Sequence, residues 1–599
     1  AIIDLSEQAH QPMQTADGRS VITYNGELYN TGVLQREIAM RASVAWRGSS
    51  DTEVLLAAVE VLGLVRALEL VEGMFAFALW DRRERQLHLV RDRFGEKPLY
   101  FGRAGGALVF SSELRALEAL PGFAPSLDRV ALGAFLQHGY VPAPLSIYEG
   151  LQKLPPGCRA VISEGAQHET RVVPYWRCRE AIEESIERGY RGDYRGAVDE
   201  LERLLGKSFS ARTVADVPLG VFLSGGIDSS LVAALARRQS GRRLATFSIG
   251  SPHQRYDEAK HAQQVAQYLG TEHTELHVTG EDGLQVALRI GELYDEPFAD
   301  SSAIPTSLLC QMTRGYVGVA LSGDGGDELF AGYNRHFRAP AIWERQRRWP
   351  LPARRAVAGL LRSVAKSGFL QSGGAAESSL ARILGSSAPA MHMHKLADAM
   401  GAPDFEAFYR QLASRFSDPG SLLRDRVQVA PPGLDLSPHL CAGEAVMAQD
   451  TMTYFPDDLL VKVDRASMRV GLEVRAPFLD RDVFRFAWSL PMEYRACGRT
   501  GKRILRDLHY RHGPRQLVDR PKQGFAVPLG DWLRHELREW AADLLQPDVL
   551  AEQGLLQPQV VARLWEGHLQ GRDSSADRLW SLLAFQAWYQ GRRGKIRRP

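Results

Sequence analysis

The sequence contains few cysteines, and no two of them form a Cys-x-x-Cys pair. The five are an odd number at wide spacing in a chain of 599 residues: Cys158, Cys178, Cys310, Cys441 and Cys497. A disulfide framework needs paired cysteines, and a thiolate zinc site needs closely spaced ones. The pattern argues against both and favours a protein of the reducing cytoplasm.

An excess of charge and a long apolar run are also missing. The chain has 73 basic and 71 acidic residues, a formal net charge of +2. Charge alone therefore indicates neither a nucleic acid nor a membrane surface as partner. No stretch approaches the roughly 20 apolar residues of a membrane helix. The basic end of the chain, GRRGKIRRP, lacks an accompanying binding motif, so we expect no nucleic-acid and no membrane partner.

The two common glycine-rich nucleotide-binding patterns are absent as well. Gly206, Lys207 and Ser208 form a GKS triplet, but Leu201 stands where G-x-x-x-x-G-K-S requires glycine. A strand followed by G-x-G-x-x-G does not occur either. A nucleotide site, if present, must use another loop.

The chain divides into two regions of different pattern. Residues 1–180 are rich in strand-like segments, such as SVITYNGELYN and QLHLVRDRF, with one helix signal in SDTEVLLAAVEVLG. A charged, helical segment at 181–195 makes a plausible linker. From 196 onward, apolar strands alternate with amphipathic helices, which predicts a parallel sheet in an α/β domain reaching to 599.

The stretch GVFLSGGIDSSLVAAL, from Gly220 to Leu235, predicts an anion site in this second region. It reads as a buried strand, a glycine-bearing turn and the start of a helix, an arrangement whose backbone amides can face phosphate. Asp228 suits such a site if Mg²⁺ is also bound there. The alternative is a tight turn in which the serines and the aspartate cap the helix.

A second loop of the same kind follows another predicted strand. In VALSGDGGDELFAGY, Asp324, Asp327 and Glu328 crowd a glycine-rich turn. Carboxylates at this density repel one another unless a metal or a cationic group offsets them. A single such loop is commonly a solvated turn. Two of them after strands of one sheet favour a ligand site at the carboxyl ends of those strands.

With these two loops in view, the sequence resembles the glutamine-hydrolysing asparagine synthetases. SGGIDSS is similar to the pyrophosphate-binding PP-loop of that family, and LSGDGGDELFAGY to its second ATP-site loop. Further similar segments are YDEAKHAQQVAQYLGTEH, DEPFADSSAIPT, TYFPDDLLVKVDRASMRVGLEVRAPFLD, RPKQGFAVPLGDWL and, near the start, YNGELYN, SDTEVLL and DRFGEKPLYF. Asp295, Glu296 and Asp300 in the second of these segments are acids that we expect on a substrate-side loop. The resemblance implies an N-terminal-nucleophile glutaminase sandwich followed by a PP-loop ATP pyrophosphatase domain.

The resemblance implies a role for each matched residue of the second region. ATP and Mg²⁺ are the implied cofactors, with Asp228 and Asp327 as metal ligands. Lys502 matches a lysine that steadies charge as an acyl-adenylate forms, and Asp324 stands where several members carry a glutamate assigned to acyl transfer. The residues that would bind ATP are Leu223, Ser224, Gly225, Gly226, Asp228, Ser229, Ser230, Ile249, Ser322 and Gly323.

In the first region, the resemblance implies a glutamine site. Asn25 and Gly26 match the oxyanion hole, for which a side-chain amide and a backbone N–H are suitable donors. Asn25, Glu27 and Asp51 match residues that bind glutamine. Without the resemblance, Asn-Gly would be interpreted as a hairpin turn.

The family's nucleophile is an N-terminal cysteine, and this chain starts at Ala1 with Cys158 as its first cysteine. Either the sequence is part of a longer chain, or the enzyme uses free ammonium. We expect the former, because the other glutamine-site residues are present and the loss of the first strands would leave an unpaired sheet edge.

These observations lead to one main functional hypothesis and two alternatives. The main one is ATP-dependent amidation of aspartate to asparagine through an acyl-adenylate, with ammonia from glutamine. The alternatives are amidation of another carboxylate, such as a sugar acid of a surface polysaccharide, and a catalytically inactive scaffold. Dimers are common among relatives, so a homodimer is an open expectation.

Overall fold

The computed structural model describes most of the chain. The described residues are 2–4, 6–164, 170–239, 243–250, 258–366, 397, 399–425, 427–429, 439–498, 500–519, 527–571 and 575–597. The segment RPKQGF at 520–525, which contributes to the family resemblance, lies outside these ranges.

The first region is built on a six-stranded antiparallel sheet with the strand order β1-β2-β3-β4-β8-β9. Its second strand β2, Ser20–Leu28, alternates buried and less buried residues over its first half, because successive side chains point to opposite faces of the sheet. The other strands of this sheet are β1 (Met13–Gln14), β3 (Gly73–Asp81), β4 (Gln86–Arg91), β8 (Cys158–Ser163) and β9 (Thr170–Pro174).

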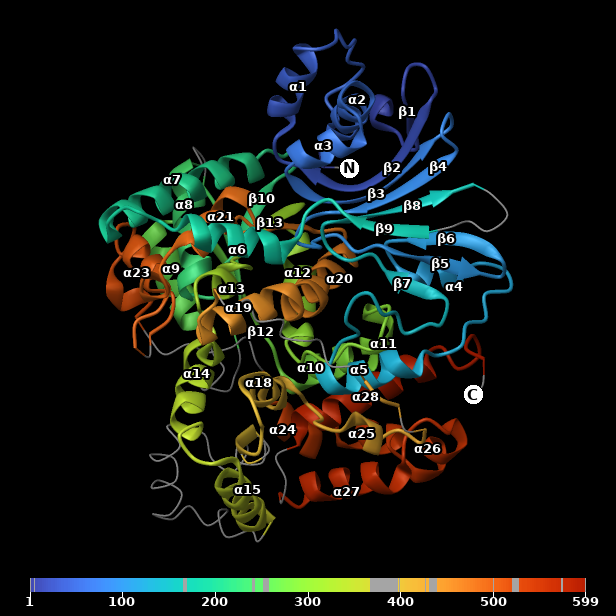
Figure 1. The fold of residues 1–599 in the computed structure, drawn as a ribbon, viewed down its shortest axis with the longest axis vertical. Coiled ribbons are helices and arrows are strands. Elements are labelled where there is room, and N and C mark those ends of the chain that lie inside the picture. Colours follow the sequence, from blue (N-terminus) through green and yellow to red (C-terminus); the bar gives the residue numbers. More distant parts are fainter. Residues whose placement is uncertain are drawn as a thin grey trace.

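Helices cover one face of this sheet and a smaller sheet covers the other (Figure 1). The helical layer consists of α1 (Thr31–Ala39), α2 (Asp51–Leu62) and α3 (Leu64–Leu70). The smaller sheet has the order β6-β5-β7, from β5 (Tyr100–Ala104), β6 (Ala107–Ser111) and β7 (Leu151–Lys153). Side chains such as Phe101 and Leu89 fill the space between the two sheets.

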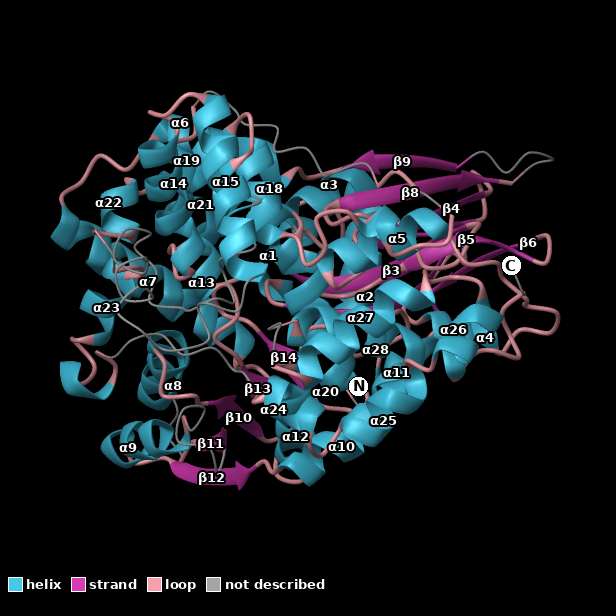
Figure 2. Cartoon of the chain, turned by 90° about the horizontal axis from the view of Figure 1, so that it is seen from below, coloured by secondary structure: helices cyan, strands magenta, loops and turns pink. Residues whose placement is uncertain are grey.

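The second region contains a five-stranded parallel sheet with the order β12-β11-β10-β13-β14. Figure 2 shows these strands side by side and apart from the strands of the first region. Their bounds are β10 (Leu219–Phe222), β11 (Ala245–Gly250), β12 (Glu272–His277), β13 (Val319–Leu321) and β14 (Glu473–Arg475).

Helices pack on both faces of the parallel sheet, as expected when crossover helices connect parallel strands. One face is covered by α6 (Cys178–Arg188), α7 (Tyr194–Arg212), α8 (Ile227–Gln239), α9 (Ala259–Leu269), α21 (Arg481–Ser489) and α23 (Arg503–His509). The other is covered by α10 (Gly280–Leu288), α11 (Ile290–Leu293), α12 (Ala303–Arg314), α20 (Leu460–Met468) and α28 (Ala576–Gln590).

The remaining helices complete the two regions. They are α4 (Leu114–Glu118), α5 (Arg129–His138), α13 (Gly326–Leu329), α14 (Asn334–Gln346), α15 (Leu351–Lys366), α18 (Phe405–Ala413), α19 (Ala442–Met452), α22 (Met492–Arg495), α24 (Leu529–Arg534), α25 (Arg538–Leu544), α26 (Pro547–Gln553) and α27 (Pro558–Leu569). A π-helical turn, Phe455–Leu459, joins the region of α19 to α20.

The two regions share a hydrophobic core. Helix α5 packs against α28, and both contribute to one cluster that also contains the C-terminal helices. Trp580 and Trp588 of α28 are fully buried in it. The chain turns back onto this core directly after α28, because Arg592 donates to Glu118 Oε1 at 2.6 Å and is 5% exposed.

The structure confirms the two-part α/β fold expected from the sequence. It also places Asn25 and Gly26 inside β2 and not in a hairpin turn. The segment 181–195, expected to be a linker, contains most of α6 and the first two residues of α7, and Ile182 of α6 is buried next to α21. Among the described residues, no helix combines the length and apolar character needed to cross a membrane.

Trp580→Ala should destabilise the second region by about 3–5 kcal/mol, the usual cost of emptying a buried tryptophan site. Trp580 is fully buried, whereas Trp349 is 54% exposed. We expect a lower urea midpoint in far-UV circular dichroism for Trp580→Ala and an unchanged midpoint for the control Trp349→Ala. Equal midpoints for the two variants would contradict the central position of α28.

Candidate active sites

The register of the parallel sheet brings the two glycine-rich loops together. Strand β10 pairs with β13 so that Val221 lies opposite Leu321. Because both strands run in the same direction, the loops that follow them leave the sheet at the same edge. The first loop begins at Leu223 and the second at Ser322.

The first loop is held by its own serines. Ser229 Oγ lies 3.1 Å from the backbone N of Ser224, which donates to it, and 3.0 Å from Ser224 Oγ. Gly225 has φ +68°, and a Cβ there would come within 2.7 Å of the backbone at His261 and Ala262. Glycine is therefore required for this turn into α8.

Ser230 offers a polar group without a structural role. Its Oγ is buried and has no hydrogen-bond partner among the residues that the structure describes. A buried hydroxyl normally has a partner. At the start of α8, where backbone N–H groups favour anions, this hydroxyl fits the phosphate site expected from the sequence.

The second loop packs directly against the first. A Cβ on Gly323 would lie 2.9 Å from Asp228 Cβ, and one on Gly326 would lie 2.6 Å from Asp228 Cγ. The absence of side chains at these two glycines lets the Asp228 carboxylate sit next to the second loop. The two loops predicted to form one site are thus in contact.

Lys502 connects the two loops by ion pairs. Its Nζ lies 2.6 Å from Asp327 Oδ1 and also pairs with Asp228 Oδ2. Burial would lower the pKa of Lys502, but the carboxylates of Asp228 and Asp327 outweigh that effect and raise it. The lysine is therefore a cation held between two carboxylates.

The backbone at this point is strained. Lys502 has φ +57° and Ala331 has φ +55°, although neither is glycine. Each such residue costs about 1–2 kcal/mol. The two residues lie close together, since Lys502 N donates to Phe330 O at 3.0 Å. Strain of this kind is characteristic of functional sites.

Two further acids of the second loop are buried. Burial is the main cause that raises the pKa of Asp324, while the Ser322 side chain and the charge of Lys462 act in the opposite direction. Burial and the charge of Asp327 raise the pKa of Glu328 to about 7, and Glu328 accepts from Tyr333 OH at 2.6 Å. Glu328 can therefore exchange a proton near neutral pH.

The other residues assigned to ATP lie around these loops. Ser322 is buried, and its N–H donates to Arg475 O on β14 at 3.0 Å. Leu223 and Ile249 are buried in the hydrophobic clusters on opposite faces of the sheet. Their backbone, and not their side chains, would face a nucleotide.

The residues expected to bind glutamine gather at β2 and the start of α2. Asp51 Oδ2 accepts from Leu28 N at 3.0 Å and from Tyr24 OH at 3.1 Å. Burial, followed by the charge of Asp51, raises the pKa of Glu27 to about 9. Burial also raises the pKa of Asp51. Two adjacent buried carboxyl groups of this kind are suited to bind an ammonium group.

The proposed oxyanion-hole residues lie on the same strand. Asn25 Nδ2 donates to Ser112 Oγ at 3.3 Å. Gly26 has φ +153°, and a Cβ there would lie 2.1 Å from Met74 O on β3. Close strand pairing therefore requires glycine at position 26, apart from any catalytic role.

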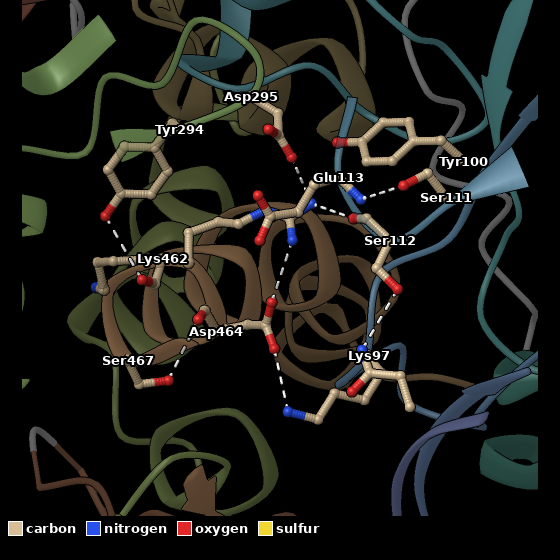
Figure 3. A network of polar contacts seen from close by, with 12 residues as sticks. Lys97, Tyr100, Ser111, Ser112, Glu113, Tyr294, Asp295, Lys462, Asp464 and Ser467 are labelled. Atoms are coloured by element: carbon tan, nitrogen blue, oxygen red, sulfur yellow. Dashed lines mark hydrogen bonds and ion pairs between the residues drawn. The ribbon is translucent and has the colours of Figure 1, made fainter. Parts of the chain in front are cut away.

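A buried polar network joins the two regions (Figure 3). Lys97 Nζ lies 3.2 Å from Asp464 Oδ1, and Arg465 donates to Ser112 O at 2.7 Å. Arg465 also lies 2.9 Å from Asp295 Oδ2. Asp295, which its sequence position predicts to be a substrate-side acid, has an arginine at the interface as its partner.

Glu296, the acid that follows Asp295, also makes its contacts at this interface. It lies 2.7 Å from Lys153 Nζ and accepts from Tyr100 OH at 3.0 Å. Both partners belong to the small sheet of the first region. The loop that precedes α12 therefore orients one region on the other.

Comparison with known proteins identifies the two halves. Residues 200–590 match the family model described as asparagine synthase, and residues 1–176 match the glutamine amidotransferase domain. The chain belongs to the asparagine synthase family. It is a glutamine-dependent ligase of that family.

Similar proteins span almost the whole chain. A protein of Mycobacterium tuberculosis named "Putative asparagine synthetase (glutamine-hydrolyzing)" is 32% identical over 98% of this chain and 87% of its own length. Asparagine synthetase (glutamine-hydrolyzing) 1 of Bacillus subtilis is 29% identical over 98% of this chain and 88% of its own. Among solved structures, glutamine phosphoribosylpyrophosphate amidotransferase from B. subtilis is 15% identical over 46% of this chain and 75% of its own, with a TM-score of 0.24, too low to carry an argument.

Several residues near these sites had no assigned role in the sequence. Arg475 of β14 lies between the two sites, Lys462 lies near Asp324, and Asp458 lies in the π-helical turn. The alternation of Leu472, Glu473 and Val474 before Arg475 is too short to have indicated a strand. Nothing in the sequence pattern indicates what the side chains of Lys462 and Asp458 contact.

Gly332→Ala should impair the ATP site while leaving the chain folded. A Cβ at position 332 would lie 1.9 Å from Asp327 Oδ1 and 2.2 Å from Lys502 Cε. We expect a loss of ammonium-dependent activity on the order of a hundredfold, the effect of misplacing catalytic groups by about 1 Å. Gly359→Ala is the control, since a Cβ there meets nothing within 4 Å. Full activity of Gly332→Ala would contradict the described packing of Asp327 against Lys502.

Proposed function

We propose that this chain converts aspartate to asparagine with ATP and ammonia derived from glutamine. The aspartate side-chain carboxylate attacks the α-phosphorus of ATP, which forms an acyl-adenylate and releases pyrophosphate. Ammonia then attacks the acyl carbon and displaces AMP, and the proton lost from ammonia passes to a base. Adenylation is needed because a free carboxylate is a poor electrophile with a poor leaving group.

The observation that carries this proposal is the ion-pair cluster of Lys502, Asp228 and Asp327. It joins two loops at the carboxyl ends of adjacent parallel strands, at the start of helix α8. A lysine there can stabilise the negative charge that develops as pyrophosphate leaves. Asp324, three residues before Asp327, is the proposed acid–base group for the acyl transfer.

Asp228 and Asp327 are also the proposed ligands of Mg²⁺. Their carboxylates share one cation in the structure, and oxygen donors of this type suit Mg²⁺, which commonly binds through one or two carboxylates plus phosphate oxygens. Bound Mg²⁺ would neutralise charge on the leaving pyrophosphate. Lys502 would remain within reach to contact a phosphate oxygen.

A charged cluster next to Asp324 supports an amino acid as the acceptor. Lys462 Nζ lies 2.9 Å from Asp300 Oδ2 and donates to Ser302 Oγ at 2.8 Å. The charges of Asp300, Asp458 and Asp324 all act on Lys462. Three acids around one lysine leave an excess of acidic groups that can bind another cation. The α-ammonium group is such a cation, and aspartate has one whereas a simple sugar acid lacks it.

Asp458 is the proposed partner of that ammonium group. It is 3% exposed, and its Oδ1 has no hydrogen-bond partner among the described residues. Burial, followed by the charge of Asp300, raises its pKa to about 8. It lies in the π-helical turn Phe455–Leu459, a kind of irregularity that is frequent at functional sites.

A cytoplasmic location is part of the proposal. All five cysteines are free thiols in the structure, including the exposed Cys441 and Cys497. Free thiols fit a reducing compartment. The homodimer expected from relatives stays a prediction.

Pyrophosphate release with ATP, Mg²⁺ and ammonium should require aspartate and should be lost in Asp228→Ala. Ammonium replaces glutamine as nitrogen donor, so the assay tests the second region alone. Asparagine formed in equal amount to pyrophosphate, measured by mass spectrometry, would support the proposal. Folded protein that binds ATP but releases no pyrophosphate with aspartate would exclude aspartate and direct the search to other carboxylates, sugar acids included.

Asp458→Asn should raise KM for aspartate about tenfold or more, because a contact to a charged group contributes about 1.5–3 kcal/mol. KM for ATP should not change. The matched control is Asp457→Asn at the neighbouring position, where the carboxylate accepts from Ala143 N at 2.8 Å and an amide oxygen can still accept. Equal KM values for aspartate in the two variants would contradict the role of Asp458.

A further inference from the structure

Arg475 is a fully buried arginine that lies between the two active sites. It is the last residue of β14, next to β13 in the parallel sheet, and it pairs in register with Leu321. Its side chain reaches back toward the first region, where Nη2 lies 3.4 Å from Glu27 Oε2. Both side chains are at most 5% exposed, so solvent does not screen this contact.

The second region fixes the guanidinium group firmly. Nε lies 2.7 Å from Glu473 Oε1, and Nη1 donates to the carbonyl oxygens of Arg212 and Val214 at 2.9 and 2.6 Å. Nη2, in contrast, makes no hydrogen bond among the described residues and has the Glu27 carboxylate as its charged neighbour. The planar guanidinium group therefore presents one nitrogen to Glu27 from a position set by the second region.

The backbone of the same residue supports the ATP site. Arg475 O accepts from Ser322 N at 3.0 Å, where the second glycine-rich loop begins. A shift of β14 would therefore move the start of the loop that carries Asp324 and Asp327. One residue thus contacts a group of the glutamine site and a group of the ATP site.

We propose that Arg475 is a positioning residue that couples the two sites: its side chain holds Glu27 for the ammonium group of glutamine, and its backbone links that contact to Ser322. The proposal rests on the proposed glutamine site at Glu27 and Asp51. It goes beyond that assignment, because it predicts that nucleotide and glutamine each change the affinity for the other.

The charges around Glu27 give the direction of the effect. Burial and the charges of Asp51, Glu473 and Asp216 all raise the pKa of Glu27, and Arg475 is the group that lowers it. Glutamine binding needs the ionised carboxylate. Without the charge of Arg475, Glu27 should hold its proton up to a higher pH.

The test is calorimetric titration of the full chain with glutamine, with and without ATP, at neutral and mildly alkaline pH. At neutral pH, Arg475→Gln should weaken glutamine binding about tenfold or more, since an opposite charge at this range shifts a pKa by about 1–3 units. The deficit should shrink once the pH approaches the Glu27 pKa of about 9, where the carboxylate of the unmodified chain is itself ionised. ATP should change the glutamine affinity of the unmodified chain by about fivefold or more and that of the variant much less.

Two variants separate this role from a merely structural one. Arg481→Gln removes another contact between the regions, an ion pair of 2.6 Å with Glu72 that touches neither site, and should leave glutamine affinity and its ATP dependence unchanged. Arg475→Lys retains the charge without the guanidinium fork and should recover part of the affinity but not the ATP dependence.

Ammonium-dependent pyrophosphate release, measured in parallel, reports on the proposed synthetase reaction independently. Unchanged glutamine binding in Arg475→Gln would overturn the proposal, as would an ATP effect of equal size in both proteins. No glutamine binding by the unmodified chain would overturn it too, while leaving the ammonium assay to decide the proposed function.

Discussion

The proposed ATP site depends on one buried cation shared by two carboxylates. Lys502 comes from a segment far along the chain, Asp228 from the first glycine-rich loop and Asp327 from the second. Burying three charges together is costly unless they pair closely. Removing Lys502 would leave two buried carboxylates without their cation, so the cluster fixes the relative position of three distant segments. It also keeps one more negative than positive charge, which suits a site that is proposed to accept Mg²⁺ together with ATP.

The register of the parallel sheet makes this cluster possible. Strands β10, β13 and β14 are neighbours, and their carboxyl ends provide the first loop, the second loop and Arg475 in that order. Since a parallel sheet brings all strand ends to one edge, three segments separated by about a hundred residues or more meet there without a dedicated scaffold. The strained backbones of Ala331 and Lys502 then place the lysine ammonium between the carboxylates.

Sequence patterns predicted much of this arrangement. The strand–glycine–helix pattern around Asp228 and the repeated pattern around Asp324 predicted two loops at one sheet edge, and the structure places Gly323 and Gly326 against Asp228. The three-residue strand β14 was not predicted, because so short a segment has almost no periodicity of its own. Asn-Gly alone favours a turn, so the strand position of Asn25-Gly26 could be predicted only from the strand-like stretch SVITYNGELYN that contains it.

Contacts between distant segments could not be predicted from local patterns. Asp295 and Glu296 stand out in the sequence as acids before a helix. In the structure, Asp295 forms an ion pair with Arg465, and Glu296 forms one with Lys153, both at the interface. Their partners lie more than a hundred residues away, and no spacing rule links them.

The interface itself has a physical consequence for the proposed reaction. Water hydrolyses an acyl-adenylate in competition with ammonia unless it is kept out of the site. Buried ion pairs such as Lys97–Asp464 hold two regions together in one orientation, because a misaligned interface would leave those charges buried and unpaired. Such an interface contributes less to affinity between the regions than to their alignment. A fixed alignment is what transfer of ammonia from a glutamine site to a separate acyl-adenylate site requires. In this chain, both the alignment and the proposed coupling through Arg475 depend on buried charges between the regions.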